Sequence, residues 1–484
     1  KYTESTNTIS MNNALPTTDA TGKVRLTAGE YFDFTLSGTI KGSENINWEI
    51  AAEDVTTGTK KIDGKYIKLY LTSLDENNNE TEVMAPKVYK TESTENTYTG
   101  RPTNMMSLAK GTTSTSFSTK YRLRMYVDES YNPQGDGGNL AFSIKINAYG
   151  KTGDKIPEPT AAEVLAAKAN AEDLDYNSAT DAQKKEMWTF THEATEQTTA
   201  LTDYRYIGAD PNNYVKFNDE LWRIIGVFDT DDGTGKVEKR LKIIRNESIG
   251  SYSWDNKDTT TGAENNYGKN EWAEARLNYL LNLGHESETA GGSLYWNRGA
   301  GNCYKGYQNA TKTCDFTTTG LTEKAKAMIV TAKWYLGGTE RYNSSSNGLA
   351  SHWYKYERGT KVYSGRGTSW TGKVGLMYLS DYGYATSGGA TTNRASCLAK
   401  ELTKWDDSSV SDCKDNDWMY NSSKSQWTIT PKFNTNGVFY VDNTGYVNSN
   451  IVYGDCGVRP VVHLNSAIKV ITGSGTKESP YILE

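Results

Sequence analysis

Apolar and polar residues alternate along several extended segments in the first 150 residues. Every second residue is Ile or Leu in residues 66–71, and apolar residues follow the same period in residues 142–146. A period of two gives a β-strand one buried face and one solvated face. Polar loops such as residues 75–82 separate these segments. The pattern therefore predicts a β-sandwich or jelly roll over residues 17–150.

Residues 214–228, which read YVKFNDELWRIIGVF, contain two β-prone runs separated by Asn218 and Asp219. These short polar residues tolerate left-handed backbone, so the stretch is predicted to be a hairpin. Residues 229–235, DTDDGTG, then lead into a further predicted strand at residues 237–246. The DTDDGTG loop resembles the front of a calcium-binding loop but lacks the bidentate Glu, which favours an ordinary hairpin loop.

Three segments have helical patterns. Thr160 is followed three residues later by Glu163, which predicts a capping box at the start of a helix over residues 160–173. Apolar stripes predict two further helices, over residues 270–283 and 321–336.

These patterns predict a mainly β protein with four parts. Residues 1–16 are polar and without a sharp period, so we expect an extended arm that can act as a donor strand. The β-sandwich over residues 17–150 follows, and residues 151–200, with Pro157 and Pro159, are predicted to be a linker with a short helix. Residues 201–484 are predicted to form one α+β domain.

The composition narrows the classes of partner. The chain has 33 Tyr and 12 Trp, a net charge of −6, and no strong cluster of Lys and Arg, which argues against a nucleic-acid partner. No apolar run approaches the length of a membrane helix. Because no secretory segment is evident and this composition is common in secreted surface proteins, we expect an extracellular protein with Lys1 as its mature N-terminus.

All five cysteines lie in the last two fifths of the chain, and none forms a CxxC motif. Cys303 and Cys314 bracket one polar loop, and Cys397 and Cys413 bracket another. We therefore predict these two pairs as disulfides, and we expect Cys456 to be unpaired or intermolecular.

The C-terminal half resembles a known domain. The segments that carry the resemblance are WRIIGVF at Trp222, IIRNESIGSYSWDN at Ile243, NEWAEARLNYLLN at Asn270, residues 370–385, QWTITP at Gln426 and GVRPVVHLNS at Gly457. Residues 203–484 resemble a domain of Gram-positive gut-bacterial surface proteins that is similar to the C-type-lectin-like fold of the formylglycine-generating-enzyme group. The resemblance implies that the first and last strands pair, here residues 214–228 with residues 458–464. Because Pro cannot donate to a central ladder, Pro460 should lie at the start or edge of its strand.

The N-terminal part more faintly resembles the camelysin and TasA-type matrix-fibre family. The carriers are LTAGEYFDFTL, IKLYLTSL and FSIKINAYG, within residues 8–150. Members of that family look like secreted β-sandwiches that polymerise by lending an N-terminal strand to a neighbour. The arm over residues 1–16 is placed as such a strand would be, and a disordered tail is the alternative.

The residues do not support an enzyme, and we assign no catalytic, cofactor-binding or metal-binding residue. Cys413 and Cys456 do not match the paired-cysteine copper site of a formylglycine-generating enzyme. The four His residues lie in no recognisable nucleophile context, which argues against a hydrolase. Calcium is left open, with Asp381, Asn416 and Asp417 as candidates by residue type only.

A ligand surface is predicted in the late loops, formed by Trp353, Tyr382, Tyr384, Trp405 and Asp381. Ring faces stack on apolar patches of a sugar or protein while carboxylates fix its orientation. The alternative is that the rings fill the core of a domain with few aliphatic residues. Trp370 and Trp427 are expected in the core.

Two functions fit these patterns. The first is a structural subunit of an extracellular filament, such as a pilus or biofilm-matrix fibre, which polymerises with itself by strand donation and carries an outward lectin-like domain. The alternative is a monomeric surface adhesin that binds glycan or a host protein. Neither a sortase-type LPxTG motif nor a C-terminal apolar tail occurs in the sequence, which favours the filament.

Overall fold

A computed structural model describes the chain at residues 2–4, 9, 14–27, 29–91, 98, 100–102, 105–133, 140–155, 158–257, 267–338 and 348–484. Strands account for 39% of the described residues and helices for 14%, so the protein is mainly β, as predicted. The chain divides into two compact units, Lys1–Glu158 and Pro159–Glu484, which we call the first unit and the second unit.

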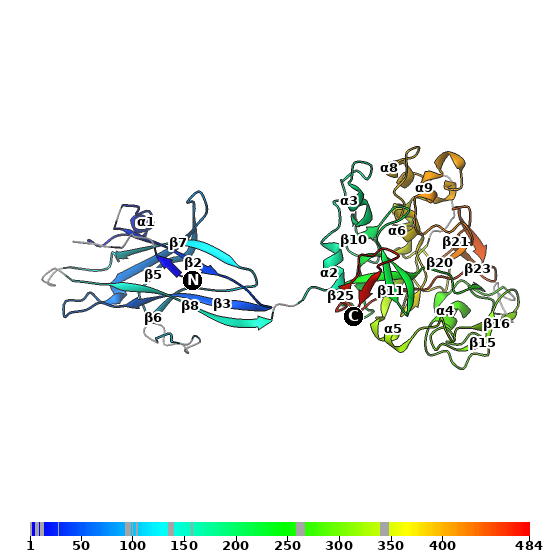
Figure 1. Ribbon diagram of the computed structural model, residues 1–484, viewed down its shortest axis with the longest axis horizontal. Helices are drawn as coiled ribbons and strands as arrows, with labels where there is room; N and C mark the ends of the chain where they lie inside the picture. The colour runs from blue at the N-terminus through cyan, green and yellow to red at the C-terminus, as the bar shows by residue number, and fades with distance from the viewer. Residues whose placement is uncertain are drawn as a thin grey trace. The chain divides into compact units, whose positions relative to one another are not determined.

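The first unit consists of two antiparallel sheets (Figure 1). Among the described residues, one sheet has five strands in the order β1-β2-β7-β4-β5 and the other has three in the order β6-β3-β8. The elements are β1 (Tyr2–Glu4), α1 (Asp19–Gly22), β2 (Tyr31–Gly38), β3 (Glu44–Asp54), η1 (Gly64–Tyr66), β4 (Ile67–Leu74), β5 (Glu80–Val88), β6 (Met105–Thr113), β7 (Phe117–Val127) and β8 (Ile144–Lys155).

Alternation along the strands builds the core of the first unit. Leu69 and Leu71 of β4 pack with Ile50 of β3 and Ile146 of β8, so side chains from both sheets share one apolar cluster. A period of two thus buries one face of each sheet, which is the arrangement of a β-sandwich. The predicted sandwich is present, and β8 extends it to Lys155.

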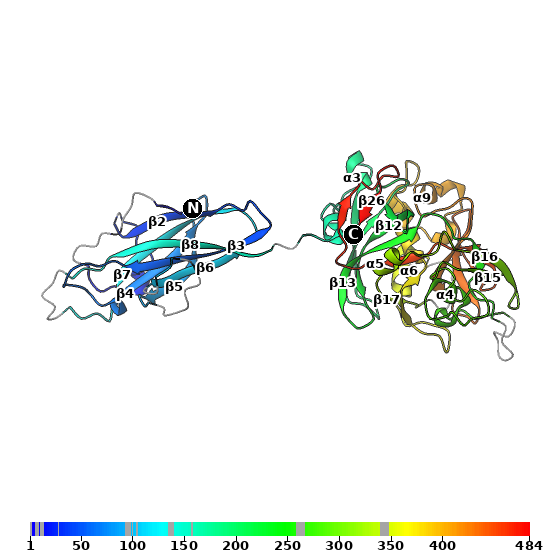
Figure 2. The same ribbon diagram turned by 60° about the horizontal axis from the view of Figure 1, so that its bottom comes forward.

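The second unit is built around a nine-stranded sheet in the described residues. Its main path is β19-β24-β13-β12-β11-β26-β25, with β10 paired to β12 and β9 paired to β10. These strands are β9 (Met187–His192), β10 (Leu201–Tyr206), β11 (Tyr214–Phe217), β12 (Glu220–Asp231), β13 (Val237–Arg245), β19 (Val374–Gly375), β24 (Val461–His463), β25 (Val470–Thr472) and β26 (Tyr481–Leu483). Figure 2 shows β12, β13 and β26 in this sheet.

Smaller sheets and short helices complete the second unit. Five more strands pair in the order β14-β23-β20-β21-β22, and β15 pairs with β16 and β17 with β18 in the described part of the chain. The remaining strands are β14 (Ser251–Ser253), β15 (Ala300–Tyr304), β16 (Thr311–Asp315), β17 (Ala332–Tyr335), β18 (Ser369–Gly372), β20 (Gln426–Pro431), β21 (Gly437–Val441), β22 (Val447–Ile451) and β23 (Asp455–Gly457). The helices are α2 (Ala161–Ala166), α3 (Asp181–Lys185), η2 (Trp272–Glu274), α4 (Arg276–Leu281), α5 (Glu323–Met328), α6 (Ala350–Glu357), α7 (Leu379–Tyr384), α8 (Arg394–Leu398), η3 (Leu402–Lys404), η4 (Ser408–Val410) and α9 (Asp412–Asp415).

The predicted hairpin is present as β11 and β12. Asn218 and Asp219 connect the strands with φ angles of 57° and 61°, the left-handed conformation that a tight hairpin turn requires. Trp222 and Ile224 of β12 are fully buried. The hairpin therefore lies in the core of the second unit.

The implied pairing of residues 214–228 with residues 458–464 is wrong. β24 (Val461–His463) pairs with β13, which separates it from β12. The strand that pairs with β11 is β26, near the end of the chain. Pro460 does lie just before its strand, where its carbonyl accepts a hydrogen bond from the Arg245 N–H at 3.0 Å.

The helix predicted over residues 321–336 is only partly present. Thr322 caps α5, which ends at Met328, and residues 332–335 form β17 instead. Trp334 is fully buried in that strand, and its indole N–H donates to the carbonyl of Gly372 in β18 at 3.2 Å. Pairing with a distant strand therefore overrides the helical pattern. The predicted helix over residues 270–283 is likewise shortened to η2 and α4.

Residues 151–200 are not a linker throughout. Residues 151–155 belong to β8, and the capping box of Thr160 and Glu163 opens α2, whose Ala161, Ala162 and Leu165 are buried in the core of the second unit. β9 joins the large sheet through β10. Pro157 lies outside the described residues. Within the described residues, no helix is long and apolar enough to span a membrane.

Candidate functional site

An apolar groove in the first unit is bordered by Ile9 of the arm. The groove has a volume of about 290 Å³ and is lined from β2, β7, β8 and the segment before β8. Its apolar lining consists of Ile9, Phe32, Leu123, Met125, Phe142, Ile144 and Ile146. Ile9 is half-buried and packs against the core cluster of the sandwich. Residue 9 of the arm therefore forms one wall of a groove whose other walls come from both sheets.

The arm also contributes the edge strand of the larger sheet. β1 pairs antiparallel with β2, with Tyr2 opposite Leu36 and Glu4 opposite Phe34. β2 has eight residues, all of which pair with β7 on its other side, whereas β1 covers three of them. Residues 1, 5–8 and 10–13 of the predicted arm lie outside the described residues.

The predicted ligand surface is not on the surface. Its five members are buried, with exposed fractions of 1% for Trp353, 0% for Tyr382, 7% for Tyr384, 0% for Trp405 and 2% for Asp381. The ring of Tyr382 packs on Trp405 at 5.1 Å between centroids. Trp353 packs on Phe439 at 4.7 Å. These rings fill the core of a unit with few aliphatic residues, so the prediction of an exposed surface is wrong.

The two tryptophans predicted in the core differ. Trp427 is 1% exposed, which confirms the prediction for that residue. Trp370 is half-buried and packs against the core from β18.

Asp381 lies in a buried cluster of charges. Its carboxylate accepts a hydrogen bond from Arg205 at 3.0 Å and one from Lys242. The backbone N–H of Tyr378 also donates to it, at 2.9 Å. Burial would raise the pKa of Asp381, but the charges of Lys242 and Arg205 outweigh burial and lower it. The cluster joins α7 to β10 and β13, and Asp381 is enclosed by its partners.

A second carboxylate extends the cluster towards β9. Asp203 accepts a hydrogen bond from Arg205 at 2.8 Å, and its Oδ2 atom lies 3.0 Å from Nε2 of His192. The imidazole of His192 stacks on Tyr354 at 3.7 Å between centroids. Burial lowers the pKa of His192, and the neighbouring Asp203 opposes this effect.

Glu357 is a buried acid whose hydrogen bonds in the described residues come from Ser380 and not from a cation. Its carboxylate accepts hydrogen bonds from the backbone N–H and the hydroxyl of Ser380 on α7. Arg358 lies 3.7 Å from it. Burial raises the pKa of Glu357 to about 7, although the charge of Arg358 opposes this effect. Sequence patterns gave no signal for this residue, because its environment comes from packing between α6 and α7.

Both predicted disulfides are present. Cys303 on β15 is bonded to Cys314 on β16, and Cys397 on α8 is bonded to Cys413 on α9. Cys456 is free and buried on β23, and burial raises the pKa of its thiol to about 12. A thiol in this environment is held in its unreactive protonated form.

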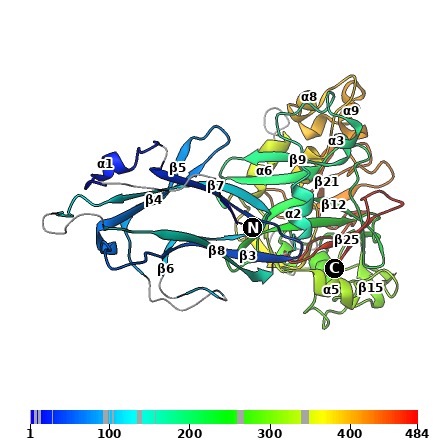
Figure 3. The same ribbon diagram turned by 60° about the vertical axis from the view of Figure 1, so that its left-hand side comes forward.

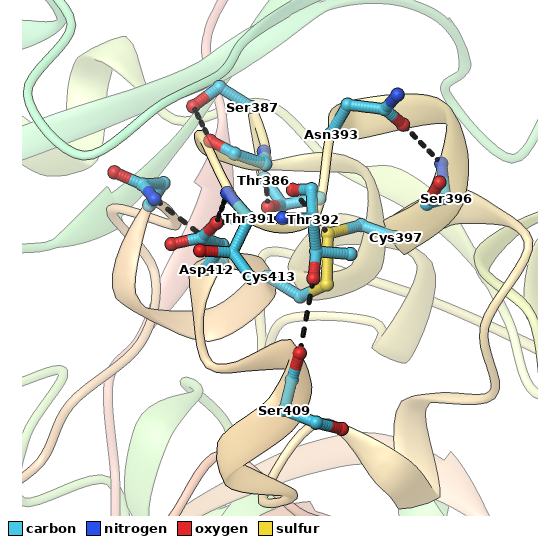
Figure 4. The surroundings of a disulfide bond; sticks show 12 residues. Thr386, Ser387, Thr391, Thr392, Asn393, Ser396, Cys397, Ser409, Asp412 and Cys413 are labelled. Atoms are coloured by element: carbon cyan, nitrogen blue, oxygen red, sulfur yellow. Dashed lines mark hydrogen bonds between the residues drawn. A yellow bond between two sulfur atoms is a disulfide. The ribbon is translucent and has the colours of Figure 1, made fainter.

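The Cys397–Cys413 disulfide holds two short helices together. α8 and α9 lie side by side (Figures 1 and 3). Asn393 caps α8 by accepting a hydrogen bond from the N–H of Ser396 at 2.9 Å. The carboxylate of Asp412 accepts from the N–H groups of Thr391 and Thr392 at 2.7 and 2.8 Å (Figure 4). Hydrogen bonds from within α8 and from α9 therefore fix the start of α8.

A cavity lies beside α8. It has a volume of about 230 Å³, and its lining includes Phe190 and His192 of β9, Tyr384 of α7 and Arg394 of α8. The predicted ligand residue Tyr384 thus borders this cavity, although little of its side chain is exposed to solvent. Sequence reasoning missed Arg394, because a single arginine in a polar segment carries no distinctive pattern.

The candidate calcium ligands are held by separate partners. Asp381 belongs to the buried charge cluster, Asn416 donates to the carbonyl of Asp412 at 3.1 Å, and Asp417 accepts from the N–H of Met419 at 2.8 Å. No group of three or more His, Cys, Asp or Glu with metal-binding geometry occurs in the described residues. In the DTDDGTG loop, Asp231 accepts hydrogen bonds from the N–H groups of Gly233 and Gly235.

Comparison with known proteins found no matching family model, no matching curated protein and no matching solved structure. The two family resemblances therefore stay predictions from the sequence.

Proposed function

We propose that this chain is a structural subunit that assembles with copies of itself by exchanging its N-terminal arm. The observation that carries the proposal is the packing of Ile9 against the apolar core of the sandwich, where it forms one wall of a groove. The other residues of the groove lie at position 32 and beyond, so the contacts that Ile9 makes are also available to the arm of another copy. Exchange of an identical element between copies is a low-cost route to assembly.

The edge pairing of the arm supports the same proposal. In the described residues β1 pairs with Phe34–Leu36, and a longer strand from a neighbour can pair along more of β2. Main-chain hydrogen bonds along an open sheet edge supply the affinity in strand addition, while apolar side chains in pockets supply the register. The two disulfides fit assembly in an oxidising compartment outside the cell.

The test compares the full chain with variants of the arm. We expect the full chain to form filaments in negative-stain images and a chain starting at Thr17 to sediment as a monomer. A synthetic peptide of residues 1–16 should bind the shortened chain and block assembly of the full chain. Substitution Ile9→Asp should abolish both effects, because it places a carboxylate in an apolar groove.

The matched control is Val24→Asp, because Val24 is 70% exposed and lies outside the arm and the groove. This variant should assemble as the unchanged chain does. Filaments of normal length from the chain starting at Thr17 would contradict the proposal. A full chain that stays monomeric at all concentrations would contradict it equally.

A monomeric surface adhesin is the second candidate function. The cavity bordered by His192, Tyr384 and Arg394 favours it, because polar and aromatic groups converge there. Binding of the full chain to glycan arrays and intact cells, with the chain monomeric by sedimentation, would support this candidate over the filament.

A further inference from the structure

The cavity beside α8 is small and open to solvent. Three of its lining residues, Glu172, Thr191 and Ser351, are exposed, so the cavity reaches the surface of the second unit. Its volume of about 230 Å³ is below the roughly 300–1,000 Å³ of sites for drug-sized ligands. The space therefore suits a ligand the size of one sugar or one amino acid.

Arg394 lines this cavity, and its guanidinium makes no hydrogen bond with the described residues. Its Nε and Nη2 atoms are buried, and neither makes a hydrogen bond. Its contact is with the ring of Phe190, at 4.9 Å from the ring centroid. A buried charged donor without an acceptor is costly, and an incoming acceptor would offset that cost.

Five other arginines in the described residues also have a buried nitrogen without a hydrogen bond, but in each of them another nitrogen of the guanidinium does make one. Arg205 binds two aspartates, Arg223 binds Asn213 and Tyr214, and Arg276 binds Glu288. Likewise, Arg240 pairs with Glu238 and Arg358 donates to the carbonyl of Tyr354. Arg394 makes no such hydrogen bond in the described residues.

The same edge of the guanidinium binds carboxylates elsewhere in this protein. Nε and Nη2 together hold Glu49 in the case of Arg101, Asp33 in the case of Arg122 and Glu220 in the case of Arg245. Their N···O distances lie between 2.5 and 3.0 Å. Two parallel N–H donors match the two oxygens of a carboxylate. Arg394 presents this edge with no carboxylate in place.

The electrostatics of the cavity favour an anion at Arg394. Burial lowers the pKa of Arg394 to about 10, and the neighbouring Tyr384 and Glu172 oppose this effect. The guanidinium therefore stays charged at neutral pH. Glu172 lies at the rim, where both of its carboxylate oxygens accept hydrogen bonds from the N–H of Thr191 at 3.1 Å.

Arg394 is also held in position before any ligand arrives. It is the first residue of α8, which Asn393 caps and the Cys397–Cys413 disulfide fixes to α9 (Figure 4). A site whose supporting residues are locked loses less entropy on binding.

We propose that this cavity binds a small carboxylate, with the carboxylate group paired to Arg394. Trp188, Phe190 and Tyr384 supply ring faces for the body of the ligand, and the lining residues Thr189 and Ser351 supply hydroxyls for its polar groups. An acidic sugar and a free amino acid share this chemistry. The proposal is independent of arm exchange, because every residue of the cavity lies in the second unit.

The experiment measures binding of matched ligands to the full chain by calorimetry and saturation-transfer NMR. Glucuronate is compared with glucose, and phenylalanine with phenylalanine amide, so each pair differs at the carboxylate. We expect the acid of at least one pair to bind about tenfold or more tightly than its neutral counterpart, because the neutral ligand leaves the guanidinium unpaired. Binding in the first pair identifies an acidic sugar, and binding in the second identifies an amino acid.

Variants separate this role from a structural one. Arg394→Gln should weaken binding of the acid by about tenfold or more, whereas Lys404→Gln, which removes an exposed charge outside the cavity, should leave it unchanged. The melting temperature of Arg394→Gln should not fall, because the variant removes a charged group whose buried Nε and Nη2 atoms have no hydrogen-bond acceptor in the described residues.

If Arg394→Gln does not fold, Ser351→Phe keeps Arg394 and fills the mouth of the cavity, and it should also abolish binding. No binding of either acid overturns the proposal. Equal binding of the acid and its neutral counterpart does so as well. Unchanged binding by a folded Arg394→Gln or Ser351→Phe variant has the same consequence.

Discussion

Asp381 and Arg205 form a buried ion pair across 3.0 Å between α7 and β10. Their side chains are 1% and 2% exposed, so the carboxylate binds the cations of its own core. A residue that sequence patterns placed on a ligand surface instead joins a helix to the central sheet. The four aromatic rings predicted for the same ligand surface also pack into the core, namely those of Trp353, Tyr382, Tyr384 and Trp405.

Asp381→Asn should strongly destabilise the second unit. The change leaves the charges of Arg205 and Lys242 buried without their acid, and breaking such a pair typically costs about 3–5 kcal/mol. Urea unfolding followed by tryptophan fluorescence measures the effect, because every tryptophan except Trp48 lies in the second unit. The exposed Asp406→Asn is the control and should change the free energy of unfolding by less than about 0.5 kcal/mol. An equal effect of the two changes would show that the ion pair does not stabilise the fold.

Trp405→Ala should lower stability rather than remove a ligand contact. The ring is fully buried against Tyr382, and deleting a buried Trp typically costs about 3–5 kcal/mol. Leu283→Ala, at a residue that is 49% exposed, is the matched control and should have little effect. Thermal unfolding by circular dichroism measures both. A Trp405→Ala variant as stable as the control would mean that this part of the core repacks without loss.

Glu357 should make the second unit less stable as pH rises through about 7. Burial raises the pKa of Glu357 from 4.5 to about 7, so the folded protein holds a proton that the unfolded chain releases near pH 4.5. The stabilisation is complete below pH 4.5 and is lost as pH rises to the folded value. Each pKa unit corresponds to about 1.4 kcal/mol, so the full effect is about 3 kcal/mol.

The variant Glu357→Gln isolates this group from His192 and His463, whose pKa values are lowered by burial and which act in the opposite direction. Unfolding free energies of the two proteins are compared between pH 5 and pH 8. The free energy of the unchanged chain should fall relative to the variant over this range. A constant difference would show that the pKa of Glu357 is not raised.

Loss of the Cys397–Cys413 disulfide should weaken both stability and carboxylate binding. A closed loop of this size contributes about 3 kcal/mol, and the bond fixes the helix that carries Arg394. The double change Cys397→Ser and Cys413→Ser is compared with the double change Cys303→Ser and Cys314→Ser. The Cys303–Cys314 disulfide closes a loop outside the cavity. Both should lower the melting temperature, and the first alone should weaken ligand binding. Equal ligand binding by the two variants would show that the Cys397–Cys413 disulfide does not support binding in the cavity.

Local patterns correctly identified the features that depend on neighbouring residues. Asn218 and Asp219 adopt the left-handed backbone that their short side chains tolerate, and Thr160 and Glu163 form the capping box that their spacing predicts. The disulfide pairs also followed from short separations along the chain, of 11 and 16 residues.

Packing between distant segments decided the remainder. Residues 332–335 continue a helical pattern but form a strand, because β18 offers a partner for it. The direct pairing expected between the hairpin and residues 458–464 fails because β13 lies between β12 and β24. A sequence pattern shows which side of a strand is apolar, but not which strand lies next to it.

The sequence by itself determined the β-rich class, the central hairpin, the helix caps and the two disulfides, because each depends on propensity or short-range geometry. Only the tertiary structure decided the roles of Trp353, Tyr382 and Trp405, because the sequence does not show whether an aromatic ring in a loop faces the solvent or the core. It also decided that the Nε and Nη2 atoms of Arg394 are buried without an acceptor in the described residues, since that depends on which elements converge around one guanidinium. Burial and pairing belong to the folded arrangement of distant residues, and the physics of a single segment does not contain them.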